Sequence, residues 1–222
     1  AQYEAVMTGN DAGLSSTPSL FGGNPHRPVE KVSHNDIQIF LQRLNEKEAD
    51  NLPGGWKYVL PTEAQWEYAC RAGSTTVYSW GNTLLADNAN WNHGSDANQT
   101  VDVGQYLPNA WGLYDMHGNV SEWTLDQYIE DAYLNLKDTI INNPFNRPTS
   151  EYPRVVRGGS WKDSAEDLQS YKRIPSEKSW KRRDPQFPKS RWWHTNAQFL
   201  GFRIVRPYDT PNIEDIEAYW IK

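Results

Sequence analysis

The stretch NAWGLYDMHGNVSEW, residues 109–123, decides the fold that we predict for this chain. Gly112 and Gly118 allow the backbone to turn or to approach another group closely. Its largest side chains present apolar surfaces that we expect to be buried nearby, which predicts a loop wrapped into the core. These side chains are Trp111, Tyr114 and Trp123.

The same stretch carries a set of oxygen atoms that suits a hard cation. Asp115 and Glu122 supply carboxylates, and the backbone around Gly118 and Val120 supplies carbonyl oxygens. Calcium binds such all-oxygen sets at about 2.3–2.6 Å. The alternative is that the two carboxylates cap local turns. The residue types leave both interpretations open.

Length and composition favour one large, loop-rich domain. The chain has 222 residues, enough for a substantial core, and no low-complexity linker divides it. Its 11 Trp and 12 Tyr predict an aromatic rather than an aliphatic core. No window approaches the ~18 apolar residues of a membrane-spanning helix. The single cysteine, Cys70, permits neither an intrachain disulfide nor a CxxC site, and we interpret it as a small core residue.

Charge is unevenly distributed along the chain. The net charge is −6, but residues 172–191 hold eight basic residues against Glu177 and Asp184, so the remainder carries about −12. This basic stretch could bind an anionic ligand, a glycan or an acidic protein, or it could be a solvated loop that balances nearby acids. The acidic total and the lack of a recognised module argue against nucleic acid. The basic residues are Lys172, Arg173, Lys178, Lys181, Arg182, Arg183, Lys189 and Arg191.

Two main helices are expected. Apolar residues at helical spacing follow Ser33, a good N-cap, and predict a helix over residues 33–48. Thr62 and Gln65 form a capping box for a second helix that ends at Gly73. Short strands are expected over residues 56–60, 155–161 and 199–206, the last pairing with the one before it. The polar run over 74–105 predicts Asx turns or a cation site.

In this order, four segments resemble the formylglycine-generating enzyme family, or sulfatase-modifying factors. That resemblance implies an α+β, modified C-type-lectin fold with short antiparallel strands and two main helices over residues 1–207. Residues 208–222 would be an acidic tail, and the family's first strands would be missing. The matching segments are LPTEAQWEYACRAG (60–73), WGLYDMHGNVSEW (111–123), RVVRGGSW (154–161) and LGFRIVRP (200–207).

The resemblance also bears on catalysis. Enzymes of the family oxidise a sulfatase cysteine with copper held by two cysteines just after the RGGSW-like segment. The corresponding residues here, 162–171, contain no cysteine. A pair of soft thiolates selects Cu(I), and serine or aspartate cannot replace it. We therefore expect no copper and incline towards a pseudoenzyme.

The resemblance also implies that calcium binds to this chain. The family's second calcium position maps onto the side chains of Asp115 and Glu122 and the backbone oxygens of Gly118 and Val120. A first position would fall near three further residues. These are Asn90, Trp91 and Asp96.

The function expected from these observations is a calcium-stabilised binding or scaffold module of an extracytoplasmic assembly. The resemblance places it in the periplasm, at the cell surface or outside the cell. The alternative is an oxidase, of the formylglycine-generating or a related metal-dependent type, that uses a non-standard site. Aromatic and arginine residues dominate binding hot spots, so a ligand or protein partner is expected at the C-terminal surface, although the two adjacent tryptophans could instead be core residues. The candidate contact residues are Trp180, Arg182, Arg183, Trp192, Trp193 and His194.

Overall fold

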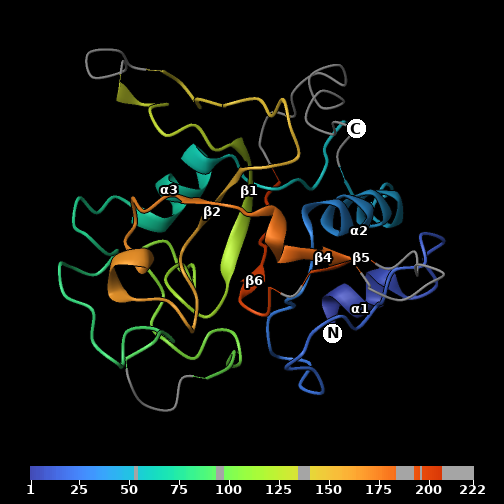
Figure 1. The fold of residues 1–222 in the computed structure, drawn as a ribbon, viewed down its shortest axis with the longest axis horizontal. Coiled ribbons are helices and arrows are strands. Elements are labelled where there is room, and N and C mark those ends of the chain that lie inside the picture. The colour runs from blue at the N-terminus through green and yellow to red at the C-terminus, as the bar shows by residue number, and fades with distance from the viewer. Residues whose placement is uncertain (53–54, 94–97, 135–140, 184–192, 196, 207–222) are drawn as a thin grey trace.

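The computed structural model describes the chain apart from residues 53–54, 94–97, 135–140, 184–192, 196 and 207–222 (Figure 1). The described part combines helices on two sides of a small sheet with long irregular segments. No helix in this part is long and apolar enough to cross a membrane. The helices are α1 (Gln2–Met7), α2 (His34–Lys47) and α3 (Glu63–Arg71), with short 3-10 helices η2 (Ala165–Leu168) and η3 (Lys178–Trp180).

Both main helices begin where their capping residues predict. The Ser33 hydroxyl accepts from the backbone N–H of Asp36, whose carboxylate accepts in return from the Ser33 N–H. Thr62 and Gln65 form the same reciprocal pair at α3. That helix ends at Ala72 in the left-handed conformation, one residue before the expected stop. The predictions for both helices are confirmed.

The main sheet has the strand order β3-β2-β1-β6. Its central strand β1 pairs antiparallel with β2 and parallel with β6. The prediction that the last strand pairs with residues 155–161 is therefore wrong, because β1 lies between them. Residues 56–60 form only an isolated bridge, from Val59 to Val205. The strands are β1 (Ser121–Gln127), β2 (Arg154–Arg157), β3 (Ile174–Pro175) and β6 (Leu200–Gly201), with β4 (Lys181–Arg183) and β5 (Trp193–Thr195) forming a separate pair.

The largest core cluster lies between the sheet and the helices α1 and α2. Trp123 of β1 stands in it, and its indole N–H donates to the carbonyl of Val32 at 3.0 Å. Figure 1 shows α3 on the other side of β1 from α1 and α2. A smaller cluster there joins Trp66 and Cys70 of α3 to Met116. The sheet is thus covered on both sides, which explains why every residue of β1 is buried.

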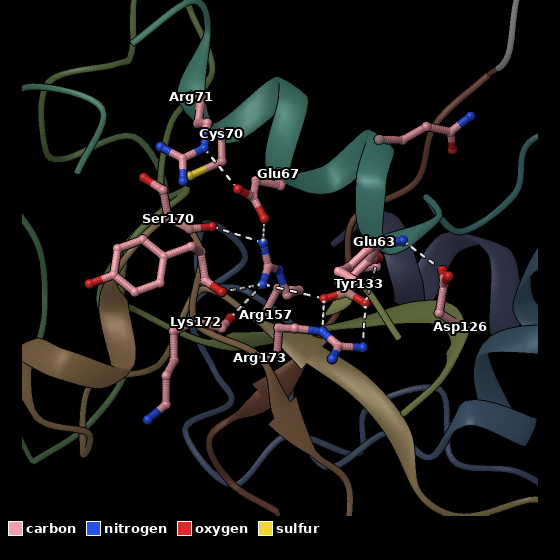
Figure 2. Close-up of polar contacts among 12 residues, drawn as sticks. Glu63, Glu67, Cys70, Arg71, Asp126, Tyr133, Arg157, Ser170, Lys172 and Arg173 are labelled. Atoms are coloured by element: carbon pink, nitrogen blue, oxygen red, sulfur yellow. Dashed lines mark hydrogen bonds and ion pairs between the residues drawn. The ribbon is translucent and has the colours of Figure 1, made fainter. Parts of the chain in front are cut away.

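A buried ionic network fastens α3 to the sheet (Figure 2). Figure 2 shows the carboxylate of Glu63 between the guanidinium groups of Arg157 and Arg173. Arg173 binds both Glu63 oxygens, at 2.6 and 3.0 Å, and Arg157 forms a 3.4 Å ion pair with the same group. Arg157 is completely buried, pairs with Glu67 and donates to the carbonyls of residues 170–172. Removing one partner of such a network typically costs about 3–5 kcal/mol.

Asp126 of β1 lies at the edge of this network and forms no ion pair with any residue in the described part of the chain. Its carboxylate accepts from the backbone N–H groups of Glu63 and Asn146, at 2.6 and 3.0 Å. Burial raises the pKa of Asp126 to about 6, and the charge of Glu63 adds to the rise. The folded protein therefore holds this proton more tightly than the unfolded chain, whose aspartates titrate near 3.9.

This difference predicts a pH-dependent contribution to stability. The stabilisation from protonated Asp126 is complete below about pH 4 and is lost as pH rises through about 6. Relative to Asp126→Asn, which cannot titrate, the wild type should lose up to about 3 kcal/mol of unfolding free energy between pH 4 and 7. Urea unfolding of both proteins across this range measures the difference. If the difference in unfolding free energy between the wild type and Asp126→Asn did not change with pH, the raised pKa of Asp126 would be contradicted.

Candidate loop for a cation, residues 109–122

The organising stretch folds as a tight loop followed by β1. The Asn109 side chain accepts from the N–H groups of Trp111 and Leu113 and donates to the carbonyl of Ala69. These bonds turn the loop outward, so that Trp111 packs edge-on against Tyr68 on the outer side of α3. Trp111 and Tyr114 are 49% and 46% exposed, and the prediction that they are buried is wrong. Of the three large side chains, Trp123 alone is in the core.

Glu122 is the buried acidic centre of the loop. One carboxylate oxygen accepts from the indole N–H of Trp66 at 2.6 Å and from Nε of Arg203. The other accepts from Nη2 of Arg203 at 2.7 Å. The same Nη2 lies 3.2 and 3.3 Å from the carbonyl oxygens of Tyr114 and Asp115. A guanidinium is therefore surrounded by oxygen atoms of this loop.

Asp115 is the second carboxylate of the loop. Its backbone is in the left-handed region, with φ 53°, and its Oδ2 accepts from the N–H of Gly104 at 2.7 Å. Burial raises the pKa of Asp115, while Arg203 acts in the opposite direction. Asp115 and Glu122 together carry two negative charges against one guanidinium. The excess negative charge suits an additional cation, so the donor set fits calcium on electrostatic grounds.

No three His, Cys, Asp or Glu side chains stand together as a metal-binding group within the described ranges. A cation at this loop would therefore need backbone oxygens beside the carboxylates. Asp115 and Glu122 would hold it through their side chains, and Gly118 and Val120 through their carbonyls. Such a mixture of carboxylate and carbonyl ligands is common for calcium.

Asn90, one of the ligands predicted for the first calcium site, packs directly on this loop. The carbonyl of Asn90 accepts from the N–H of Asn119 at 2.9 Å, and the Asn90 amide donates to the carbonyl of Gln99. Trp91 is half-buried, and its indole donates to the carbonyl of Leu85. Asp96 lies outside the described residues. The structure thus brings Asn90 against Gly118, whereas a complete first site involves residues that it does not describe.

The segment after the glycine bend at residues 158–159 contributes to packing. Both glycines have positive φ, and a Cβ on Gly159 would lie 2.6 Å from the Leu168 side chain. Asp163 accepts from the Ser160 hydroxyl at 2.6 Å, and burial raises the pKa of Asp163. Residues 162–171 are therefore tied to the bend by a hydrogen bond and by close contacts.

Cys70 is buried beside a histidine. Its Sγ lies 3.4 Å from Nε2 of His117. Nδ1 of His117 lies 2.7 Å from the carbonyl of Leu168, which can only accept, so Nδ1 carries the proton and the single lone pair of Nε2 accepts from the Ser79 N–H. Burial raises the pKa of Cys70 to about 12 and lowers that of His117 to about 4. The pair is neutral, and Cys70 packs as the small core residue that the sequence predicts.

The predicted contact residues are only partly described. Trp180 packs edge-on against Trp123 and Phe199, with centroids 6.4 and 5.1 Å away, so part of its ring covers the core. The strands β4 and β5 form an antiparallel pair in which residue 182 faces 194 and residue 183 faces 193. The backbone therefore places Arg182 and Arg183 beside His194 and Trp193. Trp192 lies outside the described residues.

Sequence reasoning missed Arg203, which determines the geometry of the loop. The signal available was an arginine between apolar residues in LGFRIVRP, next to a strand expected to be buried. A buried arginine requires a carboxylate partner, and Glu122 was available. Arg157 carries the same signal within RVVRGGSW.

Comparison with known proteins gives a consistent result. A family model described as a sulfatase-modifying factor enzyme 1-like domain matches residues 2–208. The formylglycine-generating enzyme of Mus musculus is 38% identical over 61% of this chain and 36% of its own length. That of Mycobacterium tuberculosis is 30% identical over 66% of this chain and 50% of its own length. The chain thus spans about a third to a half of these relatives.

Solved structures show the same fold. The Treponema denticola variable protein 1 superposes with a TM-score of 0.68 and 27% identity, covering 91% of this chain and 79% of that protein. The structure of PvdO from Pseudomonas aeruginosa gives a TM-score of 0.64 and 27% identity, covering 84% and 64%. The expected α+β fold of the formylglycine-generating type, a modified C-type-lectin fold, is confirmed.

The close approach of Gly118 to Asn90 predicts that the loop does not tolerate a side chain. Gly118 has φ +82°, and a Cβ there would lie 2.4 Å from the backbone oxygen of Asn90. Gly118→Ala should lower the unfolding free energy by about 3 kcal/mol or more, from backbone strain and steric overlap. Chemical unfolding followed by tryptophan fluorescence measures this loss.

Gly112→Ala is the matched control. Gly112 also has positive φ, +77°, but nothing lies within 4 Å of its added Cβ. Gly112→Ala should therefore lower the unfolding free energy only by the conformational cost of about 1–2 kcal/mol. Equal losses in the two variants would show that the contact with Asn90 is not tight in solution.

Proposed function

Because the chain belongs to the sulfatase-modifying factor enzyme 1-like domain family, we propose that it is a non-catalytic member of that family. It would act as a calcium-stabilised binding or scaffold module in an extracytoplasmic assembly. The observation that carries the proposal is the single cysteine of the whole sequence, Cys70. It is buried within α3 and is paired with a neutral histidine.

The thiol inventory argues against the copper oxidase chemistry of the family's enzymes. Two thiolates are needed to hold Cu(I) as those enzymes hold it, and the chain can supply one thiolate at most. Burial raises the pKa of that thiol to about 12, which opposes thiolate formation at neutral pH. The segment in which the resemblance places the copper cysteines contains Asp163 and Leu168, and both are engaged in packing or hydrogen bonds.

Calcium is the cofactor that we propose. Asp115 and Glu122 supply an excess negative charge in a partly buried loop, and the carbonyls of Gly118 and Val120 would complete the oxygen set. Bound there, calcium would supply structural stabilisation, because a metal that binds only the folded state raises its stability. A second calcium would use Asn90, Trp91 and Asp96. The high calcium concentration outside the cytoplasm suits a periplasmic, cell-surface or secreted module.

The ligand surface that we propose is the basic stretch around β4 and β5. Arginine and aromatic residues are both frequent there, and the excess of positive charge on an acidic protein favours an anionic ligand, a glycan or an acidic protein partner. The register of the two strands places Arg182 and Arg183 on one strand and Trp193 and His194 opposite them. Residues 184–192, which join the strands, lie outside the described part.

Metal content tests the proposed module against the oxidase alternative. We expect about one calcium per chain, or two if both sites fill, after mild dialysis, and a melting temperature that falls when EGTA is added. The fall follows from losing a ligand of the folded state. Elemental analysis and thermal unfolding measure both quantities. Stoichiometric copper or iron would instead support the metal-dependent oxidase and would call for oxygen-consumption assays.

Charge reversal tests the ligand surface separately. The double variant Arg182→Glu, Arg183→Glu should leave a heparin column at lower salt than the wild type, because electrostatic binding depends on the charges that face the anion. Lys47→Glu, Lys57→Glu is the control, since it changes the net charge equally at sites outside the basic stretch. Equal elution of the two double variants would assign any binding to total charge alone.

A further inference from the structure

Arg203 occupies the oxygen cage of the loop that we propose for calcium. Its guanidinium binds both oxygens of Glu122, and its Nη2 also reaches the carbonyls of Tyr114 and Asp115. We propose that Arg203 is a built-in counter-cation of this loop and sets how strongly the loop depends on calcium. The inference rests on the calcium site proposed above and adds the residue that tunes it.

The charge balance is the first step. Asp115 and Glu122 face each other's charge in a buried region, and each is influenced by Arg203. Without a cation, the buried carboxylate of Glu122 and the half-buried carboxylate of Asp115 would repel each other, and that of Glu122 would also lack solvation. With the guanidinium in place, one of the two charges is balanced, so the loop can fold before any metal binds. Calcium then has the remaining charge to neutralise.

The occupancy of Glu122 is the second step. One of its oxygens is held by Trp66 and Arg203 together, and the other is held by Arg203. Calcium can use this carboxylate only by sharing an oxygen with the guanidinium, whose positive charge repels it. Arg203 therefore lowers calcium affinity at the same time as it lowers the loop's need for calcium. Removal of the guanidinium frees one Glu122 oxygen and leaves the two carboxylates of Asp115 and Glu122 with a combined charge of −2.

The position of Arg203 is fixed by the backbone, which is the third step. It follows β6 by two residues, and β6 pairs with β1 so that Gly201 lies opposite Glu122. A Cβ on Gly201 would lie 2.6 Å from the carbonyl of Val29, so this strand is held between neighbours. The guanidinium is delivered to Glu122 by strand pairing and is a permanent part of the loop.

Arg203→Gln tests the proposal in the full chain. In EGTA its melting temperature should fall by about 10 °C or more, because the buried carboxylate of Glu122 loses its cation next to the half-buried Asp115. Calcium should restore at least half of that loss, whereas the wild type should gain only a few degrees. Titration calorimetry should show calcium bound at least about tenfold more tightly by the variant, since the site has gained a negative charge.

Arg173→Gln is the matched control. Arg173 also binds both oxygens of a buried glutamate, Glu63, and donates to two backbone carbonyls, those of Ile129 and Glu130. Its loss should lower the melting temperature by less than the loss of Arg203, because Arg157 still pairs with Glu63. Calcium should give no recovery, because no calcium site is proposed there. Arg203→Lys keeps the positive charge and should retain the weak calcium response of the wild type.

Two results would overturn the inference. One is calcium affinity in Arg203→Gln that is equal to or weaker than that of the wild type; the other is equal recovery of Arg173→Gln in calcium. If Arg203→Gln does not fold, Asp115→Asn tests the inference instead. This variant leaves a neutral Glu122–Arg203 pair, so its melting temperature in EGTA should equal or exceed that of the wild type. Calcium should not change that melting temperature. A melting temperature of Asp115→Asn in EGTA clearly below that of the wild type would contradict the role of Arg203 as counter-cation.

The wild-type titration separates this inference from the proposed function. Absence of calcium binding by the wild type would remove calcium from the proposed function. Tight binding by Arg203→Gln in that case would still support Arg203 as a complete replacement for the metal. Binding by the wild type with no gain in Arg203→Gln would support the calcium module and reject the role of Arg203.

Discussion

The carboxylate of Glu122 joins three segments that are far apart in the sequence. It stands in β1, accepts from Trp66 of α3 and is bound on both oxygens by Arg203 just after β6. Because a buried carboxylate without partners is costly, none of the three segments can move away without a large loss of stability. Glu63 joins α3 to Arg157 and Arg173 in the same way. Interior charge pairing therefore determines how the helices and strands of this aromatic, loop-rich protein fit together.

Local chemistry made part of this structure predictable. The N-cap Ser33 of α2, the capping box of α3 and the glycine bend after β2 depend on neighbouring residues, and all three were predicted. The pairing of strands distant in sequence was not predictable. The central strand β1 has buried polar residues, Thr124 and Asp126, and therefore lacks the alternation of a half-buried strand. The partner of β6 was misassigned for the same reason. Arg203 was missed because its partner stands 81 residues away in the sequence.

The segment after the glycine bend shows how one fold can serve different functions. The resemblance places the copper cysteines of the family's enzymes there, whereas this chain uses the segment for structure. Leu168 is buried against Gly159, and its carbonyl fixes the tautomer of His117. The carbonyl of Ser170 accepts from the buried guanidinium of Arg157. The segment thus completes the core of this chain, which is compatible with the binding module that we propose.

A crystal structure of the protein grown in millimolar calcium, with anomalous scattering to locate the metal, tests the cation-centred loop most directly. We expect calcium on the side chains of Asp115 and Glu122 and on the backbone oxygens of Gly118 and Val120, with the guanidinium of Arg203 still bound to Glu122. The contrary result is a well-ordered loop with the Arg203–Glu122 pair intact and no anomalous density. It would show that the guanidinium is the only cation of the loop and that this loop does not bind calcium.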